Sequence, residues 1–313
     1  RSCRLSSFVS RAVASPVQAL RATSSLFLLA RRSIHSRIMP ASVTTRFEMV
    51  TGTAQYVVAC PETKKCAIID PVLNYNPADG KSTTESADEL LQIVKDQGFE
   101  CQWILETHAH ADHLTGSHYL HEKLPGSQTG IGARFSVVQE TFRKLYNLPE
   151  AHINGTFFDK FWKDGDKFNI GNLAVEVLLT PGHTPADVSY LIPGDAVFTG
   201  DSIFMPDMGT ARCDFPGGDT DTLWSSLQRL LQLPDETRCF VGHDYGPGGR
   251  EYGSETTIGE QRRSNKHAKE GTKKEEFIEM RTTRDAQLGA PRLLHPSLNW
   301  NIRGGHPPVA EDN

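Results

Sequence analysis

Apolar positions follow a two-residue repeat in some segments of the chain and a helical repeat in others, which predicts a mixture of strands and helices. In the first half, β-rich runs at 54–60 and 65–69 are separated by a proline-containing turn. Ser86 and Glu89 have the spacing of a capping box, which predicts a helix that ends near Gly98. Further strands are predicted at 102–106 and 128–132, and further helices at about 113–124 and 135–146.

The second half repeats this mixture. Its predicted strands are 167–170, 173–180, 189–192, 196–199 and 238–241, and its predicted helices are 219–231 and a surface helix at 274–284. Residues 246–269 are polar and Gly-rich, which predicts a loop with one or two helical turns, and the tail from Pro291 is expected to be irregular. Because hairpins outnumber strict strand–helix–strand alternation, we expect an α+β fold of two mixed sheets packed face to face, with helices outside.

Charge is distributed unevenly between the first segment and the rest of the chain. Residues 1–47 hold eight arginines, no lysine and no acidic residue. The remaining 25 basic and 38 acidic residues give 48–313 a net charge near −13. An Arg- and Ser-rich, acid-free segment is typical of a mitochondrial transit peptide. Residues 1–40 are therefore interpreted as a disordered segment that targets the protein to the mitochondrial matrix. A basic arm that binds anions is the alternative.

Composition excludes several classes of protein. The chain of 313 residues is 38% hydrophobic, which is incompatible with a disordered protein, and no apolar run approaches the roughly 20 residues of a membrane span. The acidic body argues against a nucleic-acid partner, since phosphate contacts require clustered Lys and Arg. Six scattered cysteines without a C-x-x-C pair fit a reducing compartment.

Four potential metal donors lie within six residues at the end of a predicted buried strand. They are His108, His110, Asp112 and His113. If the segment is extended, the first three point to one side, and His113 joins them from the first turn of the next helix. Imidazoles and carboxylates packed this closely are typical of a metal site.

Three further donors follow predicted strands in the second half. His183 follows Pro181-Gly182, Asp201 follows Gly200, and His243 follows Gly242. Glycine before each donor lets the backbone turn sharply and leaves space around the side chain. Together with the first cluster, these residues supply seven donors at the ends of four strands, so the sequence predicts a metal site built from these seven.

The motifs H-x-H-x-D-H, P-G-H-T, T-G-D and G-H occur in this order, and the chain resembles the metallo-β-lactamase superfamily over about residues 50–245. This resemblance implies an αβ/βα sandwich with its metal site at one edge. The catalytic domain is then expected to span 41–313, with a polar C-terminal extension from about 246. Such a fold does not choose between hydrolysis and oxidation.

Two glutathione-linked families within the superfamily compete. Residues 208–218 and the tail 291–305 resemble the corresponding segments of the persulfide dioxygenase family, whereas a glyoxalase II-like ending is not found. The first resemblance implies oxidation of glutathione persulfide by O₂ to sulfite and glutathione, in sulfide detoxification. The second implies a hydroxyacylglutathione hydrolase with two Zn²⁺. A thiol- or metal-sensing protein without catalytic activity is a third possibility, against which the full donor set argues.

The dioxygenase resemblance implies one Fe²⁺ per chain, held by His108, His183 and Asp201 as a two-histidine, one-carboxylate triad. It also implies that the other four donors orient the iron ligands or hold a second metal. These are His110, Asp112, His113 and His243. Members of the family often form homodimers.

Three residues are candidates for substrate binding. Arg212 suits a glutathione carboxylate, although a structural ion pair with Asp214 is equally consistent with the sequence. Tyr245, two residues after His243, reaches the substrate or serves as a packing aromatic. Arg303 contacts either the substrate or a neighbouring subunit.

Overall fold

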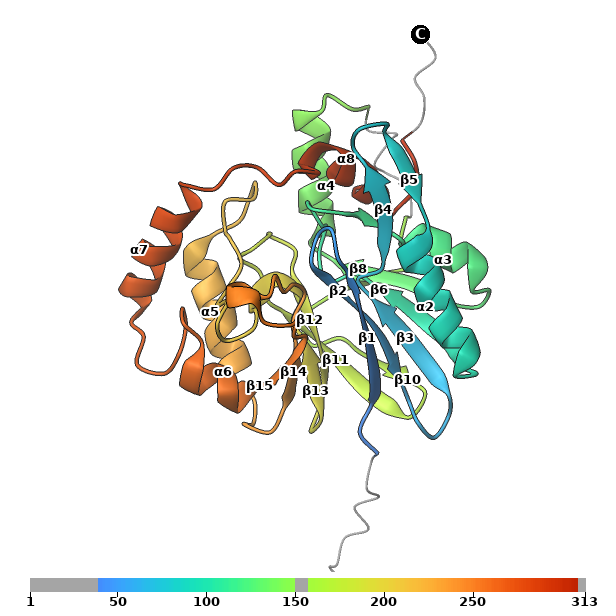
Figure 1. Ribbon diagram of the computed structural model, residues 1–313, viewed down its shortest axis with the longest axis horizontal. Helices are drawn as coiled ribbons and strands as arrows, with labels where there is room; N and C mark the ends of the chain where they lie inside the picture. The colour runs from blue at the N-terminus through green and yellow to red at the C-terminus, as the bar shows by residue number, and fades with distance from the viewer. Residues whose placement is uncertain (1–38, 150–156, 309–313) are drawn as a thin grey trace, which may run out of the picture. The chain divides into compact units, whose positions relative to one another are not determined.

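Two six-stranded mixed sheets form the centre of the computed structural model, which describes residues 39–149 and 157–308 (Figure 1). The predicted transit peptide lies outside these residues, apart from Met39 and Pro40. The first sheet has the order β1 Ser42–Glu48, β2 Thr53–Ala59, β3 Lys65–Ile69, β6 Glu100–Leu105, β8 Gln128–Gly132, β9 Lys160–Trp162. The second has the order β10 Lys167–Ile170, β11 Leu173–Leu179, β12 Val188–Ile192, β13 Ala196–Phe198, β14 Arg238–Phe240, β15 Glu255–Thr257.

Both sheets mix parallel and antiparallel pairs, as predicted. Strands β3, β6, β8 and β9 pair in parallel, and β13 and β14 form the parallel pair of the second sheet. The inner faces share one apolar core, in which the ring of Tyr56 lies 5.3 Å from that of Phe198 and 5.5 Å from that of Phe240. Burial of these large rings against both sheets fixes the sandwich.

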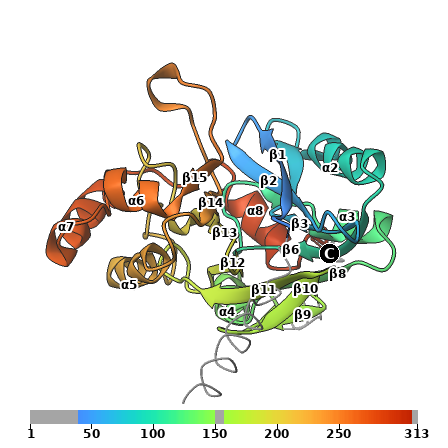
Figure 2. The same ribbon diagram turned by 90° about the horizontal axis from the view of Figure 1, so that it is seen from below.

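Helices cover the outer faces of both sheets. Their bounds are α2 Glu85–Asp96, α3 Ser117–Lys123, α4 Phe135–Leu145, α5 Thr220–Leu231, α6 Ile258–Ser264, α7 Lys274–Asp285 and α8 Leu294–Asn301. Two views place α2 and α3 on one side and α5, α6 and α7 on the other (Figures 1 and 2). Leu90 and Leu120 pack with the first sheet, and Leu227 and Phe277 with the second. No helix in the described ranges has the length and apolar character needed to cross a membrane.

Two predicted helix starts were wrong near the first sheet. The helix predicted to begin at about His113 begins at Ser117, because Leu114 and Thr115 form strand β7 and pair with Leu73 and Val72. A small sheet of order β5-β4-β7 results, with β4 at 72–76 and β5 at 81–83. The capping box predicted at Ser86 is absent, since α2 already begins at Glu85 and its N-cap residue makes no side-chain capping hydrogen bond.

The C-terminal part is more ordered than its polar sequence indicates. Helix α6, with seven residues, fits the one or two helical turns predicted for this loop, but strand β15 was not predicted, and the tail predicted as irregular contains α8. Helix α7 has the predicted bounds within one residue, but Phe277, Arg281 and Asp285 on it are buried. Leu298 and Ile302 are buried against the α4 residues Phe135 and Phe142, which explains the order of the tail.

Candidate metal centre

The loop between β6 and β7 carries the four clustered donors. Residues 107–113 form a series of bends, so the extended geometry expected from the sequence was wrong, and His113 lies in the loop and not on a helix. In a bent loop, the side chains of residues two apart need not point to the same side of the backbone. His108 therefore parts from the other three donors, and six of the seven predicted residues form two neighbouring groups, with His243 between them.

The first group consists of His108, His183 and Asp201, whose donor atoms lie within 4.8 Å of one another. The Oδ2 atom of Asp201 is 4.0 Å from Nε2 of His108 and 3.7 Å from Nε2 of His183. All three side chains are buried. They come from the ends of β6, β11 and β13, where Gly182 and Gly200 adopt positive φ and allow the sharp turns that the sequence predicted.

Hydrogen bonds at the far nitrogen fix the tautomers of both histidines. Nδ1 of His183 donates to the carbonyl oxygen of Arg212 at 2.8 Å. Nδ1 of His108 donates to Oγ1 of Thr107 at 2.9 Å, because that hydroxyl itself donates to the Asp70 carboxylate. Each ring then presents the unprotonated Nε2 to the group, as a metal-binding imidazole must.

The chemistry of the first group fits a divalent cation. Nε2 of His108 is buried and has no hydrogen-bond partner in the described part of the chain. A buried acceptor without a partner is costly unless an ion or a donor satisfies it. Two imidazoles and one carboxylate are the donor set that non-haem Fe²⁺ prefers, and they leave positions open for other ligands.

The second group consists of His110, Asp112 and His113, again within 4.8 Å. Burial and the charge of His110 lower the pKa of His113 to about 4, which keeps its ring neutral. His243 lies between the two groups: its Nδ1 is 2.7 Å from Oδ1 of Asp201 and its Nε2 is 2.9 Å from Oδ2 of Asp112. Burial opposes a charge on His243, but the Asp201 carboxylate raises its pKa well above the ordinary value.

Two acidic residues that the sequence analysis missed bind His110. Its Nε2 is 3.1 Å from Asp70 Oδ1 and 3.1 Å from Glu106 Oε2, and all three side chains are buried. Asp70 also accepts a hydrogen bond from the backbone N–H of Thr107 at 2.7 Å. Glu106 directly precedes the histidine motif and Asp70 ends a strand, but neither lies in a pattern that marks it as functional.

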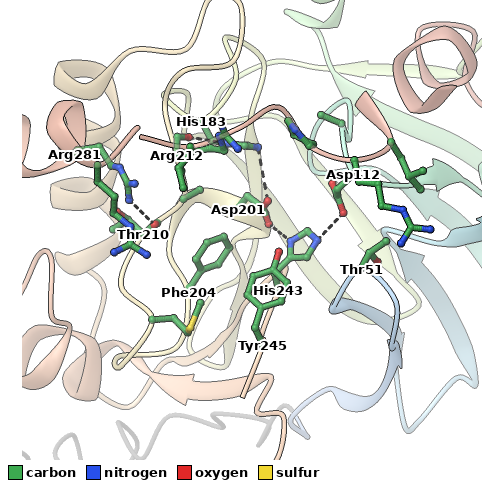
Figure 3. Close-up of a pocket in the computed structure, with 18 of the residues that line it drawn as sticks. Thr51, Asp112, His183, Asp201, Phe204, Thr210, Arg212, His243, Tyr245 and Arg281 are labelled. Atoms are coloured by element: carbon green, nitrogen blue, oxygen red, sulfur yellow. Dashed lines mark hydrogen bonds and ion pairs between the residues drawn. The ribbon is translucent and has the colours of Figure 1, made fainter. Parts of the chain in front are cut away.

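A cavity of about 420 Å³ opens onto the donors (Figure 3). Asp112, His183, Asp201 and His243 lie side by side along its wall. Its remaining lining residues are Val50, Thr51, Ala111, Phe204, Met208, Thr210, Ala211, Arg212, Tyr245, His267, Arg281, Arg284, Leu288, Pro291, Arg292 and Leu293. A concave, largely apolar site with a few converging polar groups is typical of substrate binding. His113 instead faces a neighbouring cavity of about 260 Å³.

The three substrate-binding candidates have different positions. Arg212 lines the cavity, but it forms a bidentate ion pair with Asp214 and donates to the carbonyl oxygen of Gly289 at 2.9 Å. Tyr245 lines the cavity with 52% of its side chain exposed and stacks on His243. Arg303 does not reach the cavity: it is 3% exposed and donates to Oδ1 of Asn299 at 2.7 Å.

Part of the cavity wall comes from α7 and its flanking segments, which the sequence analysis did not assign to the site, although Arg292 lies in the tail 291–305 that resembles the persulfide dioxygenases. The charge of Arg281 is balanced by Asp285. The guanidinium groups of the exposed Arg284 and Arg292 have no ion-pair or hydrogen-bond partner among residues 39–149 and 157–308. His267 accepts the Thr210 N–H at 3.0 Å, and burial, with the charge of Arg281, lowers its pKa to about 3. These residues come from the polar extension, which therefore builds one side of the cavity.

Comparisons with known proteins identify the family. The family model described as "Metallo-beta-lactamase superfamily" matches residues 50–243. "Glyoxylase B2" of Dictyostelium discoideum is 51% identical over 85% of this chain and 91% of its own length. The mitochondrial persulfide dioxygenase ETHE1 of Homo sapiens is 30% identical over 69% of this chain and 75% of its own.

The crystal structure of ETHE1 from Myxococcus xanthus has a TM-score of 0.67 and 31% identity to this chain, covering 85% of this chain and 100% of that one. The two sheets with helices outside, the donors at the strand ends and the matched family model lead to the same conclusion. The chain belongs to the metallo-β-lactamase superfamily, whose members include the persulfide dioxygenases and glyoxalase-type proteins that it resembles.

Proposed function

We propose that the chain is an iron-dependent persulfide dioxygenase that converts glutathione persulfide, O₂ and water into glutathione and sulfite. The observation that carries the proposal is the group of His108, His183 and Asp201, in which two imidazoles and one carboxylate meet beside a substrate-sized cavity. The terminal sulfur loses four electrons, which O₂ accepts, so no further oxidant is needed. Fe²⁺ held by these three residues would supply the redox chemistry that lets O₂ react with the sulfur.

The chain's own groups have distinct tasks in this reaction. His108 and His183 keep their Nε2 atoms directed at the site through the hydrogen bonds to Thr107 and Arg212. Phe204, which lines the cavity, helps to exclude bulk water from the reacting sulfur. The cavity wall formed by the α7 extension provides cationic groups for the two carboxylates of a glutathione moiety.

The arrangement of the second group supports one metal per chain. His110, Asp112 and His113 form a group that His243 does not join, and His110 is held by Asp70 and Glu106. Both ring nitrogens of His243 already lie within hydrogen-bond distance of carboxylates.

Hydrolysis of hydroxyacylglutathione is the second candidate. The name and 51% identity of the Dictyostelium relative favour it, as does the presence of a second donor group. A hydrolase of this type would hold two Zn²⁺, because hydrolysis needs a metal-activated water and no redox-active ion. In either case the substrate carries glutathione, so the cavity alone does not separate the two.

Metal content and oxygen uptake separate the two functions. Protein purified without oxygen is expected to contain about one iron per chain, by analogy with two-histidine, one-carboxylate sites. It should then consume O₂ on addition of glutathione persulfide, with one sulfite formed per O₂. Two zinc ions per chain, turnover of S-lactoylglutathione and no oxygen uptake would replace the dioxygenase proposal with the hydrolase.

Arg284 and Arg292 are proposed to bind the glutathione carboxylates, since they line the cavity and have no partner of their own in the described ranges. Each exposed arginine contributes about 0.5–1 kcal/mol to binding a carboxylate. The double variant Arg284→Ala/Arg292→Ala is therefore expected to raise KM for glutathione persulfide about 5- to 30-fold, with kcat unchanged. Steady-state oxygen uptake measures both constants.

Lys163→Ala provides the control for a general charge effect, because Lys163 is exposed and lies outside the cavity. Its KM should equal that of the wild type. An unchanged KM in the double arginine variant would remove these residues from the substrate site. The mitochondrial matrix location and the homodimer remain predictions, which fractionation and sedimentation would test separately.

A further inference from the structure

The side chain of Asn301, in the last turn of α8, is hydrogen-bonded to the backbone of the loop that carries the clustered donors. Its Nδ2 donates to the carbonyl oxygens of His110 and His113, both at 2.8 Å. Its Oδ1 accepts the N–H of Thr115, also at 2.8 Å. Asn301 is 3% exposed, so these three bonds are formed away from water. All the polar atoms of one amide are thereby used on one short loop.

This contact is one of several attachments of the loop, which Asp70 also holds through the N–H of Thr107 and the ring of His110. In the described part of the chain, no other side chain from outside the loop hydrogen-bonds the backbone of residues 109–114. The helix that presents the amide is itself fixed, because Leu298 and Ile302 are fully buried against α4. A rigid, buried anchor of this kind restricts a loop that otherwise has only irregular bends.

We propose that Asn301 is a positioning residue for the metal centre, which it acts on through the donor loop without reaching the cavity. The loop carries Asp112, Asp112 lies 2.9 Å from His243, and His243 lies 2.7 Å from the Asp201 carboxylate. A shift of the loop therefore reaches one of the three proposed iron ligands. The inference rests on the metal site of the proposed function, and it assigns a role to the C-terminal tail that the family resemblance left open.

The chemistry of the amide makes the proposal specific. Asn301→Asp has the same shape and keeps the bond from Thr115, but it places a carboxylate oxygen against two carbonyl oxygens. Asn301→Ala removes all three bonds and leaves the buried carbonyl groups unpaired. Groups that orient metal ligands typically account for about a 10- to 100-fold difference in metal affinity, so we expect each variant to weaken Fe²⁺ binding about 10-fold or more.

The test measures Fe²⁺ affinity of the full-length protein, stripped with a chelator and titrated without oxygen against a chromophoric competitor. Ser297→Ala is the matched control, because Ser297 lies one turn earlier in α8, is fully buried and has no hydrogen-bond partner for its hydroxyl among the residues that the structure describes. It should bind Fe²⁺ like the wild type. The rise in Tm on adding Fe²⁺ provides a second readout, since weaker binding reduces that rise at a given metal concentration.

A purely structural role would lower the Tm of the metal-free protein and leave the affinity for Fe²⁺ unchanged. Wild-type affinity in both Asn301→Asp and Asn301→Ala would therefore overturn the proposal. If the alanine variant does not fold, Asn301→Asp alone tests the proposal, because it preserves the side-chain volume and the hydrogen bond from Thr115. Oxygen uptake should show a lower kcat with KM for glutathione persulfide unchanged. If the wild type binds Fe²⁺ but takes up no oxygen, the proposed function fails and this inference stands.

Discussion

Replacing His183 with alanine is expected to abolish iron binding and persulfide-dependent oxygen uptake together. His183 supplies one of three donors, its Nε2 lies 3.7 Å from the Asp201 carboxylate, and it lines the cavity. Mutation of residues that only orient metal ligands typically lowers metal affinity about 10- to 100-fold. Loss of a ligand itself should therefore lower the affinity for iron more than about 100-fold. Metal analysis of protein purified without oxygen and an oxygen electrode measure the two effects on the same sample.

His295→Ala is the matched control for this experiment. His295 is exposed on α8, where its ring contacts Tyr146. It is not among the residues that line the cavity. It should retain wild-type iron and oxygen uptake. Full activity in His183→Ala would show that this residue is not an iron ligand. Loss of activity with iron retained would place it in the reaction but outside the coordination of the metal.

The fold follows from the sequence wherever local patterns agree with tertiary contacts. Strands β10 and β11 pair as a hairpin where strands were predicted at 167–170 and 173–180, and α5 begins after Asp219, whose carboxylate caps the helix. Local patterns fail where a distant partner decides. Leu114 and Thr115 look helical in sequence, but pairing with β4 makes them a strand. Helix α8 has a weak pattern and is stabilised by its contacts with α4.

The donors of the candidate site could be predicted because their residue types are rare at such spacing. Glycines before His183, Asp201 and His243 marked the turns, and these three residues line one cavity. The division of the donors into two groups could not be predicted, since it depends on the bends of 107–113. The roles of Arg284 and Arg292 were missed for a different reason: although Arg292 lies in the tail 291–305, nothing in the sequence marks an exposed arginine as a binding residue until the fold places it beside a cavity.

Gly242→Ala is expected to cause a loss of iron nearly as large as that of a ligand variant. A Cβ atom at this position would overlap Oδ1 of Asp201 and lie 2.8 Å from the carbonyl carbon of Gly200. Oδ1 is the atom that contacts His243, so the methyl group must displace either the carboxylate or the backbone behind it. A displacement of about 1 Å at a reacting site costs on the order of 100-fold in activity. Iron content and oxygen uptake should therefore fall together, by about 100-fold for the rate.

Gly289→Ala is the control that separates this steric overlap from any general loss of stability caused by replacing a glycine. Nothing lies within 4 Å of a Cβ atom at Gly289, and neither glycine has a positive φ, so the added methyl group strains the backbone at neither position. The control should keep its iron and its Tm. Because the overlap at Gly242 involves only the carboxylate and the adjacent turn, most of the fold should persist, and circular dichroism should be unchanged. Wild-type iron content in Gly242→Ala would mean that Asp201 does not need its present position to hold the metal, and the three-donor site would have to be reassigned.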